Sequence, residues 1–153
     1  MDVSVVIPTY NSELIIDKLV NKISLDTVSS YEIIVVNDKS KDNTFQKLKR
    51  IKNETPNLKI INLKENIGQV GATLVGVQNA KGEIIVTMDD DLQNPPEEIP
   101  KLIKCIHGGY DLVIGNFITK QHSFSRRLGS KVVGWLNRKV FDNSSSEVTV
   151  GPK

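Results

Sequence analysis

Short apolar runs alternate along this chain with longer segments of helical spacing, and this alternation constrains the fold most strongly. The apolar runs cover 3–8, 31–38, 58–63, 83–89 and 111–116, and the helical spacing covers 12–25, 40–54, 67–77, 95–106 and 123–141. Continuous apolar strands separated by helices are typical of a parallel sheet that is buried on both faces. The sequence therefore predicts an α/β fold, a Rossmann-like, mostly parallel sheet with helices on both faces.

Two of the predicted helices have features that a structure can check in detail. Asn11 is placed to cap the first one, whose apolar face would consist of Leu14, Ile15, Leu19 and Ile23. The third carries apolar residues at helical spacing, namely Ile67, Val70, Leu74 and Val77. Small residues between them would let this helix lie close to the sheet: Gly71, Ala72 and Gly76.

The length and composition of the chain exclude several classes of protein. Its 153 residues are enough for one domain with a hydrophobic core, and a net charge of +2 is too small to indicate nucleic acid as a partner. A single cysteine, Cys105, rules out an internal disulfide. We read neither a signal peptide nor an apolar stretch of about 20 residues that could span a membrane. We expect a cytoplasmic protein, or one lying peripherally at the inner face of a membrane, with a core over 1–141 and a loose tail over 142–153.

Polar residues follow each of the first four predicted strands directly. They form the segments PTYNSE, NDKSKDNT, KENIGQVGA and DDDLQNPPEE, which begin at Pro8, Asn37, Lys64 and Asp89. In open α/β sheets, ligands bind beyond the carboxyl ends of the strands, which is where these segments would meet. The sequence therefore predicts a binding site at this edge of the sheet.

Three consecutive carboxylates, those of Asp89, Asp90 and Asp91, end the fourth apolar run. Unit charges about 4 Å apart repel by roughly 1 kcal/mol in water and roughly 4 kcal/mol near a protein surface, so something should offset this repulsion. Asp89 and Asp91 could direct oxygens at one Mg²⁺ ion, which takes one or two carboxylates together with substrate phosphates, and Gln93 could add a neutral oxygen. The alternative is a solvated acidic turn that caps the helix beginning at Pro95.

Two further features leave alternatives open. Asp38 could accept hydrogen bonds from a nucleotide base or a sugar hydroxyl, or it could only help to build a turn. Arg126, Arg127 and Lys131 share one predicted helix, and a guanidinium group suits a diphosphate. The same basic residues would also fit a solvated helix face or contact with anionic lipid head groups.

Other classes of site lack the residues they need. No G-x-G-x-x-G follows the first run and no Walker lysine loop exists, so neither a standard dinucleotide site nor a P-loop is expected. The two histidines, His107 and His122, are isolated, and nothing indicates a Ser/His/Asp triad. A phospho-acceptor signalling domain would also place acidic residues at strand ends, but it would not explain LQNPPEE or the PTYN that follows the first run.

Four segments, taken in order, resemble the family 2 glycosyltransferases of the GT-A fold. They are VSVVIPTYNSE, YEIIVVNDKSKDNT, NIGQVGATLVGVQNAKGEIIVTMDDDLQNPPEEIPKLI and GYDLVIGN with QHSFSRRLGSK, and they run from Val3 to about Lys139. The glutamine of DLQNPPE and the segment QHSFSRRLGSK are most similar to the polyprenyl-phosphate glycosyltransferases, the group that includes dolichol-phosphate mannose synthase. The resemblance implies transfer of a sugar from a UDP- or GDP-sugar to an acceptor, a polyprenyl phosphate at the membrane surface, with inversion.

The resemblance also implies roles for individual residues. Asp38 would bind the base, and Asp89 the ribose or the metal side of the nucleotide. Asp89, Asp91 and Gln93 would hold Mg²⁺ or Mn²⁺ on the donor diphosphate. The nucleotide-sugar pocket as a whole would comprise Pro8, Tyr10, Glu13, Asp38, Gly68, Gln69, Asp89, Asp90, Arg127 and Lys131. The catalytic residues stay unknown, because the segment that would supply the acceptor site or a base is missing. The acceptor phosphate is already an anion and would need little help from a general base.

The sequence departs from the family pattern at several points. Asn37 stands where the family often has Asp, Lys39 stands where it often has Gly, and GNFITK lacks an arginine often found there. Family members also continue beyond the equivalent of Lys153 into a segment that closes the active site and positions the acceptor. We therefore expect a C-terminally truncated chain with the donor half of an enzyme, or else a nucleotide-binding module with little or no activity. A third alternative is a partner protein that docks on a homologue, on a membrane or on its own copies.

Overall fold

The computed structural model describes residues 1–115 of the chain, and their secondary structure follows the predicted alternation. The elements are β1 (Val3–Thr9), α1 (Ile16–Lys22), β2 (Tyr31–Asn37), α2 (Thr44–Glu54), β3 (Leu58–Asn62), α3 (Gly68–Gln78), β4 (Ile84–Thr87), the short 3-10 helix η1 (Pro96–Glu98) and α4 (Ile99–His107). The helix predicted over 123–141 lies outside the described residues. Among the helices of residues 1–115, none combines the length and the apolar character needed to cross a membrane.

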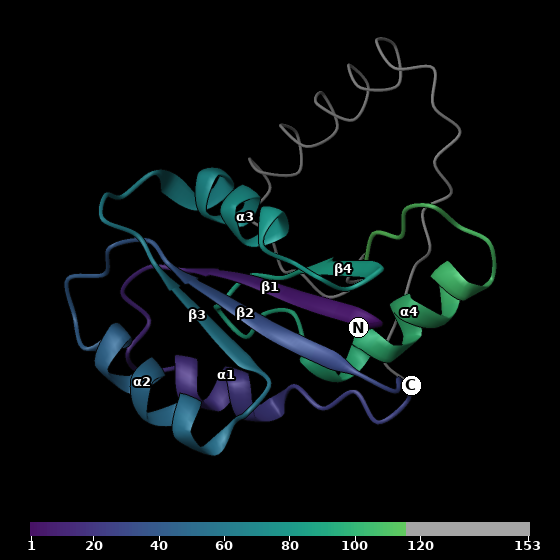
Figure 1. Ribbon diagram of the computed structural model, residues 1–153, viewed down its shortest axis with the longest axis horizontal. Coiled ribbons are helices and arrows are strands. Elements are labelled where there is room, and N and C mark those ends of the chain that lie inside the picture. Colours follow the sequence, from purple (N-terminus) through teal and green to yellow (C-terminus); the bar gives the residue numbers. More distant parts are fainter. Residues whose placement is uncertain (116–153) are drawn as a thin grey trace, which may run out of the picture. The chain divides into compact units, whose positions relative to one another are not determined.

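The four strands form a parallel sheet in the order β3-β2-β1-β4. Figure 1 shows α3 on one face of this sheet and α1 and α2 on the other. β1 is central, and every one of its residues is buried. The predicted parallel sheet with helices on both faces is therefore confirmed.

By its internal contacts the chain divides into two compact units, of which the first is Met1–Pro100. The whole sheet lies in this first unit, together with α1, α2 and α3. The second unit begins at Lys101, inside α4. The expected domain boundary at 141 falls outside the described residues and stays a prediction.

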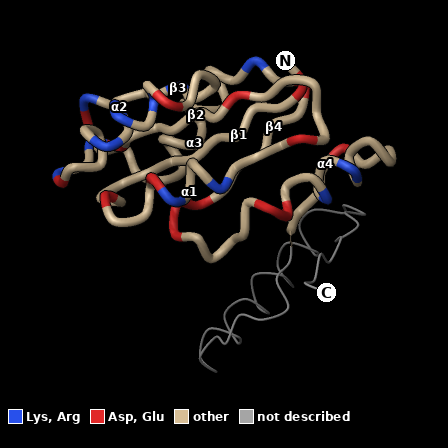
Figure 2. The backbone as a smooth tube through the Cα atoms, turned by 90° about the horizontal axis from the view of Figure 1, so that it is seen from below, with Lys and Arg blue, Asp and Glu red and all other residues tan. Residues whose placement is uncertain are grey.

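The helix predicted over 40–54 forms as α2, and it is amphipathic. Leu48 and Ile51 are buried, whereas Lys49, Arg50 and Lys52 are exposed. Figure 2 shows basic residues, in blue, along this helix. The buried side of α2 packs on β3 and α1, so its pattern fixes which side faces the sheet.

α1 begins at Ile16 rather than near Ser12, and the predicted cap at Asn11 is wrong. Asn11 has a φ of 56°, and its side-chain oxygen accepts a 2.8 Å hydrogen bond from the N–H of Lys41. Leu14 is 84% exposed, because it lies in the turn before the helix and not on the helix's apolar face. The first turn predicted for this helix is used instead to contact the loop after β2.

α3 packs on β1 and β2 through its small residues. A Cβ atom added to Gly76 would lie 2.3 Å from Cγ1 of Val6, so the close approach of helix and strand requires glycine. Ala72 is fully buried, but Val70 and Leu74 are 84% and 57% exposed. The predicted close packing through small residues is confirmed, and the apolar stripe of this helix is left largely exposed.

The predicted fifth strand over 111–116 is wrong for the residues described, because 111–115 form no strand. Leu112 and Ile114 are 65% and 56% exposed. Alternating apolar residues make a stable strand only where a neighbouring strand pairs with them. Within the described sheet, β4 therefore pairs with β1 alone.

Candidate functional site

The carboxyl ends of the parallel strands meet at one edge of the sheet, and a cavity of about 260 Å³ lies there. It is lined by Pro8, Thr9, Tyr10, Asp38, Gln69, Asp89, Asp90 and Asp91. Half of these residues are aspartates, and no lysine, arginine or histidine stands among the described residues of the lining. The loops after β1, β2 and β4 thus join the first turn of α3 to form a strongly acidic cavity.

Asp89 and Asp91 accept hydrogen bonds from different residues at the cavity wall. Nε2 of Gln69 donates a 2.6 Å hydrogen bond to Asp89, and the N–H of Gln93 donates a 2.9 Å hydrogen bond to Asp91. Within residues 1–115, no three Asp, Glu, His or Cys side chains are arranged to hold a metal ion by themselves. Mg²⁺ and Mn²⁺ can take one or two carboxylates and complete their shells with substrate oxygens. The donor set therefore fits a cation that binds together with a diphosphate.

The middle carboxylate, that of Asp90, is held by the loop after β1. Oγ1 of Thr9 donates a 2.6 Å hydrogen bond to Oδ2 of Asp90, and the hydroxyl of Ser12 donates to the same oxygen. Thr9 and Ser12 are both buried. Sequence reasoning missed these two residues, since a hydroxyl in a loop carries no pattern that names its partner.

Asp38 lies at the cavity wall and also anchors α3. Its side chain is 3% exposed, and its two oxygens accept 2.8 Å hydrogen bonds from the N–H groups of Ile67 and Gly68. Its backbone oxygen accepts a third from the side chain of Asn66. A carboxylate offers about four lone-pair sites, so these contacts leave capacity for a ligand in the cavity. Asp38 could therefore hold the start of α3 in place and also accept hydrogen bonds from a nucleotide base.

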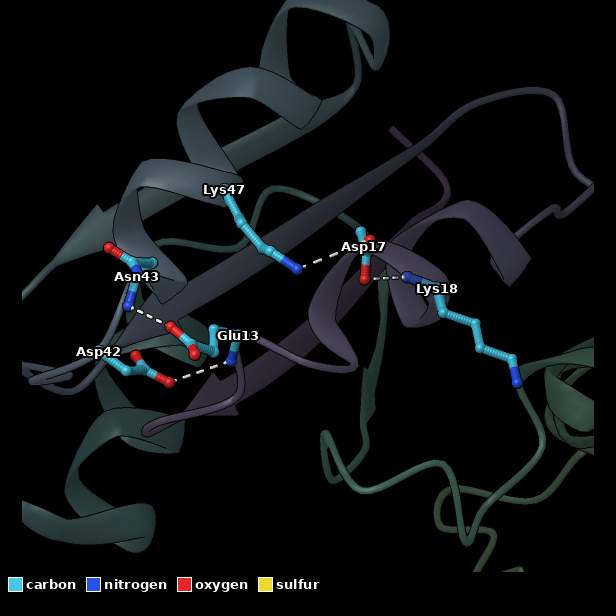
Figure 3. Close-up of polar contacts among 6 residues, drawn as sticks. All are labelled: Glu13, Asp17, Lys18, Asp42, Asn43 and Lys47. Carbon is cyan, nitrogen blue, oxygen red and sulfur yellow. Dashed lines mark hydrogen bonds and ion pairs between the residues drawn. The ribbon is translucent and has the colours of Figure 1, made fainter.

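The loops after β1 and β2 are joined by reciprocal hydrogen bonds, which Figure 3 shows. The N–H of Glu13 donates to Asp42 at 3.1 Å, and the N–H of Asn43 donates to the carboxylate of Glu13 at 2.7 Å. Burial acts to raise the pKa of Asp42, but hydrogen bonds from Thr44 and from the N–H of Glu13 outweigh it and hold that pKa below its ordinary value. Glu13 thus fastens two loops together, and it does not line the cavity.

The structure gathers most of the predicted site residues and leaves a few apart. Around the cavity lie Pro8, Tyr10, Asp38, Gln69, Asp89, Asp90 and Asp91. The lining does not include Glu13, Gly68 or Gln93, although Gly68 donates to Asp38 and Gln93 to Asp91 through their N–H groups. Arg127 and Lys131 lie outside the described residues.

Three loops at this edge each contain a residue other than glycine in the left-handed region. The φ values are 56° at Asn11, 58° at Lys39 and 58° at Leu92. Asparagine tolerates this conformation, but for other side chains it costs roughly 1–2 kcal/mol. Lys39 stands where the family that the sequence resembles often has glycine, so the loop keeps a backbone shape that suits glycine. Such strain commonly collects at functional sites.

A second and larger feature, a groove, adjoins the acidic cavity. Its volume is about 600 Å³, and it shares Pro8, Gln69 and Asp89 with the cavity. The other described residues of its lining come from α3, from β4 and from the loop that follows it, and are Val70, Thr73, Leu74, Val77, Thr87, Met88 and Asn94. This groove is mainly apolar, and its exposed apolar side chains belong to the stripe of α3 that does not face the sheet.

Comparison with known proteins finds relatives over nearly the whole chain. The family described as glycosyl transferase family 2 matches residues 4–147. The chain is 38% identical over 149 residues to undecaprenyl-phosphate 4-deoxy-4-formamido-L-arabinose transferase of Proteus mirabilis, which covers 95% of this chain and 46% of the relative. It is 39% identical over 153 residues to dolichol-phosphate mannosyltransferase of Pyrococcus furiosus, with 99% and 40% covered. The chain thus spans less than half the length of these curated relatives.

Two solved structures of similar fold contain a nucleotide sugar. A mannosyltransferase from Pyrobaculum calidifontis, in complex with GDP-Man and Mn²⁺, is 25% identical with a TM-score of 0.66, over 82% of this chain and 38% of that one. TarS of S. aureus, in complex with UDP-GlcNAc, is 28% identical with a TM-score of 0.62, over 80% of this chain and 37% of that one. Both similarities cover most of the part of the chain that the structure describes.

Proposed function

Because the chain belongs to glycosyl transferase family 2 and has the GT-A fold, we propose that it is a metal-dependent glycosyltransferase. It would move a sugar from a UDP- or GDP-sugar to a polyprenyl phosphate. An oxygen of the acceptor phosphate would attack the anomeric carbon while the bond from that carbon to the donor diphosphate breaks, which inverts the configuration. Relatives that are named for transfer to undecaprenyl and dolichol phosphates support this choice of acceptor.

The charge of the cavity is the observation that carries the proposal. Asp38, Asp89, Asp90 and Asp91 line it, and no basic residue stands among the described lining residues. A nucleoside diphosphate is itself an anion, and like charges about 4 Å apart repel by roughly 4 kcal/mol near a protein surface. The cavity therefore suits a diphosphate when a divalent cation lies between the phosphates and the carboxylates.

The metal end of the site would use residues of the loop after β4. Asp89 and Asp91 would hold Mg²⁺ or Mn²⁺, with Gln93 as a neutral third ligand. The bound cation would offset the negative charge that develops on the leaving diphosphate. Arg127 and Lys131 would contact the phosphates and supply positive charge that the described lining lacks.

The base end of the site would use residues from the first two strands. Asp38 would accept hydrogen bonds from the base through lone pairs that Ile67 and Gly68 leave free. Pro8 and Tyr10 would form apolar walls, and Tyr10 is 43% exposed, which leaves surface for such a contact.

The apolar groove supports a lipid acceptor. Its lining includes Asp89, near which the sugar-diphosphate bond would lie, and also Val70, Leu74 and Met88. An isoprenoid chain laid in this groove would keep its phosphate near the donor and its tail on apolar surface. Such a protein would work peripherally at the inner face of a membrane.

A nucleotide-binding module without transfer activity is the second candidate. All the described residues that line the acidic cavity lie within Met1–Pro100, so a nucleotide could bind there without an acceptor site. A transfer assay with labelled UDP- and GDP-sugars and a polyprenyl phosphate, run with Mn²⁺ and with EDTA, separates the two candidates. A lipid-linked product formed only with Mn²⁺ supports the enzyme, and metal-dependent nucleotide binding without product supports the module. Failure of both would contradict the proposed function.

A further inference from the structure

We propose that Thr9 and Ser12 are positioning residues of the nucleotide site, and that they act through Asp90. Their hydroxyls hold the loop after β4 against the loop after β1, which fixes the carboxylates of Asp89 and Asp91 at the cavity wall. The inference rests on the proposed function, because the role it assigns is in metal-dependent nucleotide binding.

Both hydroxyls converge on one atom. Oγ1 of Thr9 lies 2.6 Å from Oδ2 of Asp90, and Oγ of Ser12 donates to the same oxygen. Thr9 is 2% exposed and Ser12 is 6% exposed, so water has little access to compete for these bonds. Hydrogen bonds to a carboxylate are roughly twice as strong as those between neutral groups. The partners are 81 and 78 residues apart in sequence, so the contact is a long-range restraint on the loop after β4.

The loop after β4 needs such a restraint. The N–H of Met88 donates to the backbone oxygen of Val6 at 3.1 Å, where the pairing with β1 ends. Leu92, further along, has a φ of 58°, a conformation that costs roughly 1–2 kcal/mol for a residue with a Cβ atom. Asp90 lies between these two points. The hydrogen bonds to Asp90 therefore hold the loop at a point where it could otherwise move and relieve the strain at Leu92.

Ser12 is itself fixed from its other side. Its N–H donates a 2.8 Å hydrogen bond to Oγ1 of Thr44, which is fully buried and whose hydroxyl donates to Asp42. Figure 3 shows the neighbouring contact between the same two loops, from the N–H of Glu13 to Asp42. The restraint thus runs from the loop after β4, through the loop after β1, to the loop after β2. The first and the last of these loops supply the four aspartates of the described lining.

A purely structural role for Thr9 and Ser12 makes a different prediction. In that case, loss of the hydroxyls would lower the free energy of unfolding but leave the folded protein with its normal nucleotide affinity. A positioning role instead affects the part of the affinity that depends on the cation, since Asp89 and Asp91 would no longer be held in place. Comparison of binding with Mn²⁺ and with EDTA separates the two roles.

The experiment uses substitutions that keep shape while removing or keeping the hydroxyl. Thr9→Val removes the hydroxyl and Thr9→Ser keeps it. Ser12→Ala is paired with Ser24→Ala, which removes an exposed hydroxyl that donates to Asp26. Each variant is titrated calorimetrically with UDP and with GDP, in Mn²⁺ and in EDTA, at a temperature where thermal unfolding shows that it is folded.

We expect Thr9→Val and Ser12→Ala to weaken Mn²⁺-dependent nucleotide binding about tenfold or more, the scale typical of groups that orient metal ligands. Binding in EDTA should stay near that of the wild type. Thr9→Ser and Ser24→Ala should bind like the wild type under both conditions.

Three outcomes would overturn the positioning role while the proposed function stands. These are wild-type affinity in Thr9→Val and Ser12→Ala, reduced stability with unchanged Mn²⁺-dependent affinity, and an equal loss of affinity in Mn²⁺ and in EDTA. If the wild-type protein itself bound neither nucleotide in Mn²⁺, the proposed function would fail and the positioning role with it.

Discussion

Oδ2 of Asp38 accepts a 2.8 Å hydrogen bond from the backbone N–H of Gly68, which joins the end of β2 to the first residue of α3. Gly68 has a φ of 80°, a conformation that favours glycine. Free N–H groups at a helix N-terminus stabilise a carboxylate, and the helix dipole adds to this effect. Asp38 is therefore a wall of the acidic cavity and the N-terminal anchor of α3 at once.

Replacing Asp38 should change both stability and nucleotide affinity. Asp38→Ala leaves the N–H groups of Ile67 and Gly68 without their charged acceptor and should lower the free energy of unfolding by about 1–3 kcal/mol. Asp38→Asn keeps one acceptor oxygen and should cost less. Denaturant unfolding measures the first effect. Titration with UDP and GDP in EDTA measures the second, and we expect weaker binding for both variants.

Asp2→Ala is the matched control for Asp38. Asp2 also accepts a backbone hydrogen bond, from the N–H of Ser30 at 3.0 Å, but it lies at the opposite end of the sheet. Its replacement should lower stability and leave nucleotide affinity unchanged. Wild-type affinity in folded Asp38→Ala would limit Asp38 to its structural role.

Lys39→Gly should stabilise the protein. The φ of 58° at Lys39 strains a residue with a Cβ atom, and glycine adopts it freely. The gain is reduced by the greater freedom of glycine in the unfolded chain, so we expect a net increase of about 0.5–1 kcal/mol in the free energy of unfolding. Lys41→Gly also removes a lysine side chain from this loop, but Lys41 has no positive φ. This substitution should therefore lower the free energy of unfolding. Equal destabilisation by both substitutions would contradict the strain at Lys39.

Gly76→Ala should destabilise the packing of α3 on the sheet. The added Cβ atom would lie 2.3 Å from Cγ1 of Val6 and 3.1 Å from Cγ2 of Val36. Overpacking of a buried contact typically costs about 1–3 kcal/mol, which denaturant unfolding would show. At Gly71→Ala the nearest atoms to the added Cβ would be those of the Ile67 side chain, at 3.0 Å, so this substitution should cost much less. A loss no larger for Gly76→Ala than for Gly71→Ala would mean that α3 and β1 are not closely packed.

Asp42 should make the folded state sensitive to acid. Its pKa is held below the ordinary value of 3.8 in the folded chain, so its ionised form stabilises the fold. This contribution is fully present above the unfolded pKa and is lost as the pH falls through the folded one. Asp42→Asn weakens the hydrogen bonds from Thr44 and Glu13 and should cost about 1 kcal/mol at pH 7.

Unfolding measured from pH 7 down to pH 3 should show the difference between the wild type and Asp42→Asn becoming smaller at the acid end. Asp26→Asn provides the charge-matched control, since Asp26 is exposed and accepts a hydrogen bond from the hydroxyl of nearby Ser24. A difference between wild type and Asp42→Asn that did not change with pH would show that ionisation of Asp42 does not support the fold.

The fold and the family were predictable because their signals repeat along the chain. Each strand is a mainly apolar run, and each polar segment follows a strand, so the edge of the sheet that holds the cavity could be named in advance. The family prediction and the GT-A fold are confirmed. The spacing of apolar residues did not show which face of α3 is buried. This helix packs on the sheet through small residues such as Gly76, and larger apolar residues stay exposed.

The side-chain contacts at the site were less predictable, since they join residues far apart in sequence. Nothing near Asp90 identifies Thr9 and Ser12 as its partners. The polar groups of Asn11 and Ser12 looked like the start of a helix, yet they bond to Lys41 and to Thr44 in the loop after β2. Local patterns predict elements, and these tertiary hydrogen bonds then shift where the elements begin.

Calorimetric titration of the chain with UDP and with GDP, each in Mn²⁺ and in EDTA, tests the central claim most directly. The claim is that the acidic cavity binds a nucleoside diphosphate through a divalent cation held by Asp89 and Asp91. We predict that one of the nucleotides binds in Mn²⁺, that EDTA weakens this binding strongly, and that Asp91→Asn has the same effect as EDTA. Equal binding in Mn²⁺ and in EDTA, or no binding of either nucleotide, would contradict the claim.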